Sequence, residues 1–96
     1  MHEHGKVIFV ECPREGASER TGEVWKSQDF VIEIDGRYTR KVKFNLYGAE
    51  RVDKAQLQVG MIVDVDAEVE AHEYQGKWYN EIRAWRISCN GVNLFG

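Results

Sequence analysis

The chain has 96 residues, of which 43% are hydrophobic and 30% are charged, and its formal net charge is −3. This length predicts one domain over residues 1–96, and the composition excludes a disordered chain. No apolar stretch approaches the roughly 18 residues of a membrane span, and the start of the chain lacks the apolar run of a signal peptide. We therefore expect a cytoplasmic protein with no membrane partner.

The first part of the chain predicts one strand and then a loop. The run "KVIFVEC" (6–12) is short, apolar and rich in β-branched residues, as strands are, but its alternation does not identify an inward face. Residues 13–23 are rich in Gly, Ser and charge and have no apolar periodicity, so they predict a loop. His2 and His4 precede the strand, and we expect them in a mobile terminus rather than at a metal site.

The next residues predict two antiparallel strands, at about 25–34 and 40–47. Apolar and polar residues alternate in both, which predicts one face in the core and one in solvent. Between them, Asp35-Gly36 favours a tight two-residue hairpin, because Gly accepts the positive φ that such a turn requires.

After Gly48 the spacing of the apolar residues becomes helical, which predicts a short helix over 49–58. Residues 61–70 alternate again, with valine and alanine inward and four acids outward, and predict a fourth strand that faces the core as far as Val69. A turn at Gln75-Gly76 leads into a fifth strand. Five strands with a helix between the third and the fourth is the order of the OB-fold, an all-β Greek-key barrel that often holds oligonucleotides.

The fifth strand contains two tryptophans and a tyrosine, and alternation divides it into two faces. The face expected in the core carries Trp78, Asn80, Ile82 and Ala84. The outward face carries Tyr79, Glu81, Arg83 and Trp85. If this alternation continued along the strand, Arg86 would be buried and Ile87 exposed. We therefore expect either a β-bulge near Ala84 or burial of Trp85 in a subunit contact.

Charge is distributed unevenly along the chain. Residues 36–47 contain four cations and no acid, whereas residues 61–73 contain five acids and no lysine or arginine. In an OB barrel these basic and acidic strands are not neighbours. Cations that alternate with aromatic rings suit a surface that neutralises phosphate and stacks bases.

The candidate nucleic-acid-binding residues lie on the outward faces of the second, third and fifth strands. They are Trp25, Arg40, Lys41, Lys43, Tyr47, Tyr79, Arg83 and Trp85. Asp29, Glu33 and Glu81 share this surface and are expected to weaken binding. Lysines on a strand also serve solubility and edge protection, which is the alternative interpretation of Lys41 and Lys43.

The segment "VKFNLYGAERVDKAQLQVGMIVDVDAEVEAHEYQGKWYNEIRAW" (42–85) resembles the third-to-fifth-strand half of bacterial single-stranded DNA-binding proteins. The shared features are an aromatic residue on the third strand, Gly60 before the fourth, and "WYNEI" where that family has a Tyr-Thr-Thr-Glu-hydrophobic run. Over nearly the whole chain, "EVWKSQDF" (23–30) and "GKWYNEIRAW" (76–85) are similar to the bacterial domain-of-unknown-function family 3127. These resemblances imply an OB-fold and, from the first family, binding of single-stranded DNA.

The leading hypothesis is a non-catalytic OB module that binds single-stranded DNA or RNA and forms a homodimer or higher homo-oligomer. No catalytic motif occurs in the sequence, and we expect no cofactor and no metal. Cys12 and Cys89 lack the spacing of a zinc site and are expected to be buried free thiols. The alternative is an OB domain for protein–protein contact, through its acidic fourth strand and its apolar first strand.

Overall fold

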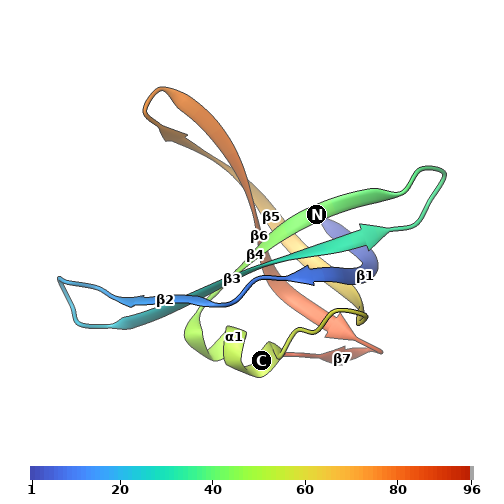
Figure 1. The fold of residues 1–96 in the computed structure, drawn as a ribbon, viewed down its shortest axis with the longest axis horizontal. Coiled ribbons are helices and arrows are strands. Elements are labelled where there is room, and N and C mark those ends of the chain that lie inside the picture. The colour runs from blue at the N-terminus through green and yellow to red at the C-terminus, as the bar shows by residue number, and fades with distance from the viewer. Residues whose placement is uncertain (96) are drawn as a thin grey trace.

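The computed structural model describes residues 1–95 (Figure 1). The elements are, in order, β1 (His2–Val10), β2 (Arg14–Ala17), β3 (Val24–Ile34), β4 (Arg40–Tyr47), α1 (Ala49–Ala55), β5 (Ile62–Tyr74), β6 (Lys77–Cys89) and β7 (Val92–Asn93). Among these residues, no helix is both long and apolar enough to span a membrane.

The five long strands close into a barrel. The strand order is β1-β5-β6-β4-β3-β2, and β1 pairs with β3 as well, which joins the two sides of the sheet. The short strands β2 and β7 are additions at the edges of β3 and β6. The expected all-β barrel, with its helix between the third and fourth long strands, is therefore confirmed, and basic β4 and acidic β5 are not neighbours.

Strand β1 closes the barrel by changing partner along its length. Its first part, from His2 to Lys6, pairs with β5, and its second part, from Lys6 to Val10, pairs with β3. The register with β3 shifts between Val7 and Phe9, so Val7 is fully buried while Phe9 is 53% exposed. This irregularity explains why the alternation of "KVIFVEC" did not identify an inward face.

The change of partner brings two backbones unusually close at Gly5. A Cβ atom added to Gly5 would collide with the backbone carbonyl oxygen of Glu33 on β3. Only glycine therefore fits where β1 passes from β5 to β3.

The core lies between the inner faces of the strands and under α1. Its largest fully buried side chains are Phe30, Phe44, Ile32, Leu46, Ile87, Val7, Val63 and Val65. Phe30 and Phe44 are direct cross-strand partners whose rings stack with centroids 5.4 Å apart. The helix contributes Val52 and Ala55, both buried. These residues account for the apolar alternation that the sequence displays.

The Lys26 ammonium on β3 donates a hydrogen bond of 2.7 Å to Asp53 and so links α1 to the sheet. This hydrogen bond raises the pKa of Lys26 above its ordinary value. The contact is exposed, and the burial of Val52 and Ala55 remains the main attachment of the helix.

Two predictions for the first half of the chain were wrong. Residues 13–23 are not simply a loop, because Arg14–Ala17 forms β2 and extends β3 as a hairpin. The β3–β4 connection is also longer than the expected two-residue turn, since β3 ends at Ile34 and β4 begins at Arg40. Gly36 is not among the residues with positive φ, so the Asp35-Gly36 turn does not form.

The predicted helix over 49–58 is a turn too long. It ends at Ala55, where Gln56 adopts a left-handed conformation with φ 45°. The expected mobile terminus at His2 and His4 was also wrong, because both residues belong to β1 and pair with β5.

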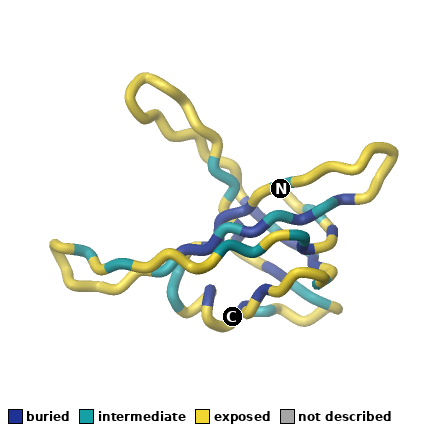
Figure 2. The backbone as a smooth tube through the Cα atoms, viewed as in Figure 1, coloured by how far each residue is buried: buried dark blue, intermediate teal, exposed yellow. Residues whose placement is uncertain are grey.

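The β5–β6 hairpin extends beyond the barrel as a two-stranded arm, defined here as residues 68–80. Every residue of the arm is exposed, and Figure 2 shows it projecting from the buried centre. Val69 and Trp78 were predicted to face the core, but they are 52% and 69% exposed. Their alternation is correct, yet the arm has no barrel beneath it, so those predictions were wrong.

We expect Gly5→Ala to destabilise the protein by about 1–3 kcal/mol, because the methyl group forces β1 away from β3. Chemical denaturation would measure the loss. Gly36→Ala is the matched control, since the nearest atom to its added Cβ lies 3.7 Å away and its φ is not positive. Equal stability of the two variants would contradict the requirement for glycine at residue 5.

Candidate nucleic-acid interface

The outer face of the β3–β4 pair carries polar and aromatic side chains in register. On this face, Lys41 lies opposite Glu33, Lys43 opposite Val31, Asn45 opposite Asp29 and Tyr47 opposite Ser27. Strand β6 then runs parallel to β4 through the pairing of Asn45 with Arg83. The face therefore spans three strands, as the sequence predicted.

An open groove of about 630 Å³ lies between β4 and the base of the arm. It is lined by Met1, Arg14, Asp29, Lys41, Val42, Lys43, Asn45, Asn80, Glu81 and Ile82. Lys41 and Lys43 are the two predicted site residues that it contains. Within residues 1–95 neither lysine forms an ion pair, so both ammonium groups are available to a ligand.

A polar network fixes the floor of the groove. The Asn45 amide donates hydrogen bonds to the Ser27 hydroxyl at 2.7 Å and to Asp29 at 2.9 Å. The Arg14 guanidinium lies 3.3 Å from Asp29 and 3.0 Å from Glu11. Asp29 is thus compensated locally, which limits the weakening effect expected from its charge.

Glu81 is compensated in a similar way. Its carboxylate lies 3.3 Å from Arg83 and 3.1 Å from His72. Arg83 is therefore engaged by an acid, although it stays exposed beside the groove. Arg40 does not line the groove. It forms an ion pair with Glu3 of β1 at 3.6 Å.

Two predicted aromatic residues lie at the β2 end of the same outer face. The Trp25 ring covers Gly16 so closely that a Cβ there would be 2.8 Å from the ring. Trp25 keeps 37% of its surface exposed and Tyr47 keeps 54%. A ring supported on one face and open on the other is suited to stacking with a planar group.

The structure places Trp78 and Trp85 differently from the sequence prediction. Asn80 and Ile82 line the groove, and Trp78 projects from the same face of β6 by alternation. Glu81 of the opposite face lines the groove too, so alternation does not decide whether Trp78 faces it. Trp78 is 69% exposed on the arm, where the sequence predicted core. Trp85, which the sequence placed on the binding surface, lies against α1 in a separate pocket.

The β-bulge expected near Ala84 is confirmed and explains this position of Trp85. Asp66 pairs with Arg86 and the next residue of β5, Ala67, pairs with Ala84, so Trp85 is the extra residue. Ile87 consequently returns to the core with no exposed surface. Tyr79 does not line the groove but is 53% exposed on the other face of the arm.

Sequence reasoning missed Arg14 and Asn80. Arg14 was hidden in a segment that looked like a loop, and no motif marks it. Asn80 was assigned to the core face, and a strand of 13 residues was the available signal, because strands in small barrels are usually shorter.

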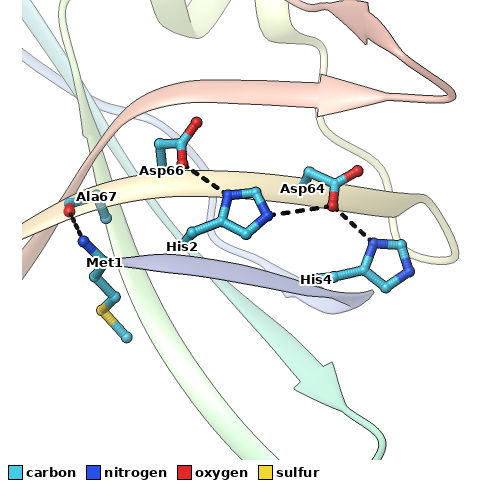
Figure 3. Close-up of polar contacts among 6 residues, drawn as sticks. All are labelled: Met1, His2, His4, Asp64, Asp66 and Ala67. Atoms are coloured by element: carbon cyan, nitrogen blue, oxygen red, sulfur yellow. Dashed lines mark hydrogen bonds and ion pairs between the residues drawn. The ribbon is translucent and has the colours of Figure 1, made fainter.

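The acidic outer face of β5 contributes no lining residue to this groove, and its Asp64 and Asp66 contact β1. His2 lies 2.7 Å from Asp66 and His4 lies 2.9 Å from Asp64, through their Nδ1 atoms (Figure 3). His2 Nε2 also lies 3.6 Å from Asp64. These contacts hold the start of β1 on β5.

Residues 1–95 contain neither a cluster of metal-ligating side chains nor a disulfide bond. Among them, no group of three or more His, Cys, Asp or Glu side chains is placed to hold a metal ion. Cys12 and Cys89 are free cysteines, but the expected burial was wrong, because Cys12 is exposed and Cys89 is half-buried.

The closed barrel of five strands, with its helix between β4 and β5, is an OB-fold. A solved structure with this fold, titled "small single-stranded DNA-binding protein from Streptomyces coelicolor", matches with a TM-score of 0.56 and 16% sequence identity. The match covers 94% of this chain and 92% of that one. At this level of identity the likeness establishes the fold.

The family follows from the sequence. The profile of the family described as "Domain of unknown function (DUF3127)" matches residues 3–88, and the chain belongs to this family. A comparison with curated proteins gives no match.

We expect Trp78→Ala to change the free energy of unfolding by less than about 1 kcal/mol, because the side chain is largely in solvent. Phe44→Ala, which empties a fully buried position, should cost about 3–5 kcal/mol. Urea denaturation of both variants tests this difference. A loss at Trp78 as large as that at Phe44 would indicate that the arm packs against something in solution.

Proposed function

We propose that this protein is a non-catalytic module that binds single-stranded nucleic acid along the outer face of β3, β4 and β6. The observation that carries the proposal is the pair of unpaired lysines, Lys41 and Lys43, in the groove between β4 and the arm. A related fold described as a single-stranded DNA-binding protein supports it.

The electrostatic argument depends on which charges are compensated. Asp29 and Glu81 each have a cationic neighbour in contact, whereas Lys41 and Lys43 form no ion pair among the described residues, although Glu33 lies opposite Lys41 across the strands. The groove lining carries three cations, Arg14, Lys41 and Lys43, against two acids, so its charge is opposite in sign to the net charge of −3 of the chain. A phosphate backbone following β4 would release counterions from both lysines.

Exposed aromatic rings accompany the two lysines. Tyr47 and Trp25 lie toward β2 on the same outer face, and Trp78 is exposed on the arm. Each stacked base contributes roughly 1–3 kcal/mol regardless of its identity. The arrangement supports binding with little sequence preference, in which rings hold bases and lysines hold phosphates.

We expect replacement of Lys41 and Lys43 by Gln to weaken binding of a labelled polypyrimidine strand. Two lost phosphate contacts should reduce the slope of log K against log salt by about 1.4, at about 0.7 per contact on a single strand. Fluorescence anisotropy at several salt concentrations measures both quantities.

Lys6→Gln is the control for charge, because Lys6 is exposed on β1 and does not line the groove. It should leave the affinity and the salt slope nearly unchanged. Absence of binding by the wild-type protein at low salt, where attraction to phosphate is strongest, would exclude the proposal. The protein-contact interpretation would then replace it.

We also propose that the chain forms a homodimer or higher homo-oligomer. Phe9 on β1 is 53% exposed, and Val69 on β5 is 52% exposed where it continues the core face of the barrel into solvent. A small domain gains by covering such apolar surface with a second copy. Light scattering at high micromolar concentration should give at least twice the mass of 11.1 kDa, and a monomer would contradict this proposal.

A further inference from the structure

A second pocket of about 270 Å³ is lined in part by residues of α1. Figure 1 shows α1 at the end of the barrel away from the arm. The lining of the pocket comes from α1, β6 and the C-terminal residues. The lining residues are Glu50, Arg51, Lys54, Trp85, Arg86, Asn93 and Phe95. The pocket shares no lining residue with the groove, so the two can be altered separately.

The β6 bulge contributes two residues to this pocket. Because Trp85 is the extra residue, Trp85 and Arg86 are both exposed between buried Ala84 and buried Ile87. Regular alternation would have turned one of the two inward. The bulge therefore exposes an indole ring and a guanidinium on consecutive residues, and both line the pocket together with residues of α1.

The residues that line this pocket carry three cations and one acid, and Asp66 of β5 lies outside the lining as the cross-strand partner of Arg86. Within residues 1–95, neither Arg51 nor Arg86 forms an ion pair. The Arg51 guanidinium is held over the Phe95 ring, 5.6 Å from its centroid. An arginine placed by an aromatic ring while its donors stay free is prepared to receive an anion.

The other charged pair of the pocket is internally balanced. The Lys54 ammonium donates a hydrogen bond of 2.7 Å to Glu50, and this contact lowers the pKa of the Glu50 carboxyl. Glu50 therefore stays ionised near neutral pH and engages Lys54. The two arginines are left as the cations that a ligand can use.

We propose that this pocket binds one nucleotide unit, with its base stacked on Trp85 and its phosphate held by Arg51 and Arg86. Planar guanidinium groups bind phosphate oxygens in pairs of hydrogen bonds, and exposed indoles stack on any base. The volume is at the lower limit of small-molecule sites, which suits one nucleotide and not a longer segment. The unit is either a free nucleotide or one nucleotide of a strand.

Acidic peptides also bind arginine, so carboxylates are the competing ligand. A nucleotide is favoured because it supplies both the anion and the planar ring that this pocket accommodates. A peptide would leave the exposed face of Trp85 without a specific partner unless it also carried an aromatic side chain.

The test is a titration with adenosine 5′-monophosphate, followed by the indole N–H signals of the three tryptophans in NMR spectra. Trp25→Phe, Trp78→Phe and Trp85→Phe assign these signals. We expect the Trp85 signal to move and the other two to stay. Adenosine and inorganic phosphate, titrated separately, should each bind more weakly than the nucleotide.

The decisive variant is Arg51→Gln with Arg86→Gln, which should raise the dissociation constant about tenfold or more. Lys41→Gln with Lys43→Gln removes the same charge from the groove and should leave nucleotide binding unchanged. Glu50→Gln should strengthen binding by removing the one acid of the pocket. Since these readouts do not involve the groove, failure here and failure of strand binding are distinguishable.

Titration with a 5′-phosphorylated oligonucleotide distinguishes a free nucleotide from one nucleotide of a strand as the ligand. Movement of the Trp85 signal with the oligonucleotide alone assigns the unit to a strand, and movement with the mononucleotide assigns it to a free nucleotide, provided that both depend on the arginines. The proposal is overturned if neither ligand moves the Trp85 signal at millimolar concentration. It is also overturned if the double arginine variant binds normally, or if an Asp-Asp-Phe peptide binds more tightly than either.

Discussion

The barrel depends on the passage of β1 from β5 to β3 at Gly5. One strand supplies backbone hydrogen bonds to both sides of the sheet, and it can do so because the chain has no side chain at the point of closest approach to Glu33. Without this passage β5 and β3 would be open edges, and a small sheet with two open edges is prone to pair with other chains. Closure then places the outer face of β3, β4 and β6 on one curved surface.

The irregularities in β1 and β6, more than regular alternation, determine which aromatic side chains lie on the surface. The extra residue in β1 turns Phe9 outward, and the extra residue in β6 turns Trp85 toward α1 and returns Ile87 to the core. Each bulge keeps the apolar pattern in the barrel while directing one aromatic side chain elsewhere. Because Trp85 is the inserted residue, it lines the pocket beside α1 and not the groove.

Alternation and the change to helical spacing after Gly48 were sufficient to predict the barrel and most of its buried residues, but alternation alone would have exposed Ile87. The same alternation predicted that Lys41 and Lys43 of β4 lie on the outer face of the barrel. Alternation cannot reveal where a strand leaves the barrel, so Trp78 was misplaced, and it cannot reveal that a charged residue has a partner, so the engagement of Arg40 by Glu3 was not foreseen. Both depend on three-dimensional neighbours that are distant in sequence.

The arm has consequences for motion as well as for contact. Two strands without a covering layer are marginally stable by themselves, so residues 68–80 can open while the barrel stays intact. A ligand that rests on Trp78 must first hold the arm in one position, and that ordering subtracts from the observed affinity. Cross-strand pairs such as Glu70 with Glu81 and Tyr74 with Lys77 help to set the stiffness of the hairpin. Changing the pair at Tyr74 and Lys77 would therefore tune binding without touching a residue that lines the groove.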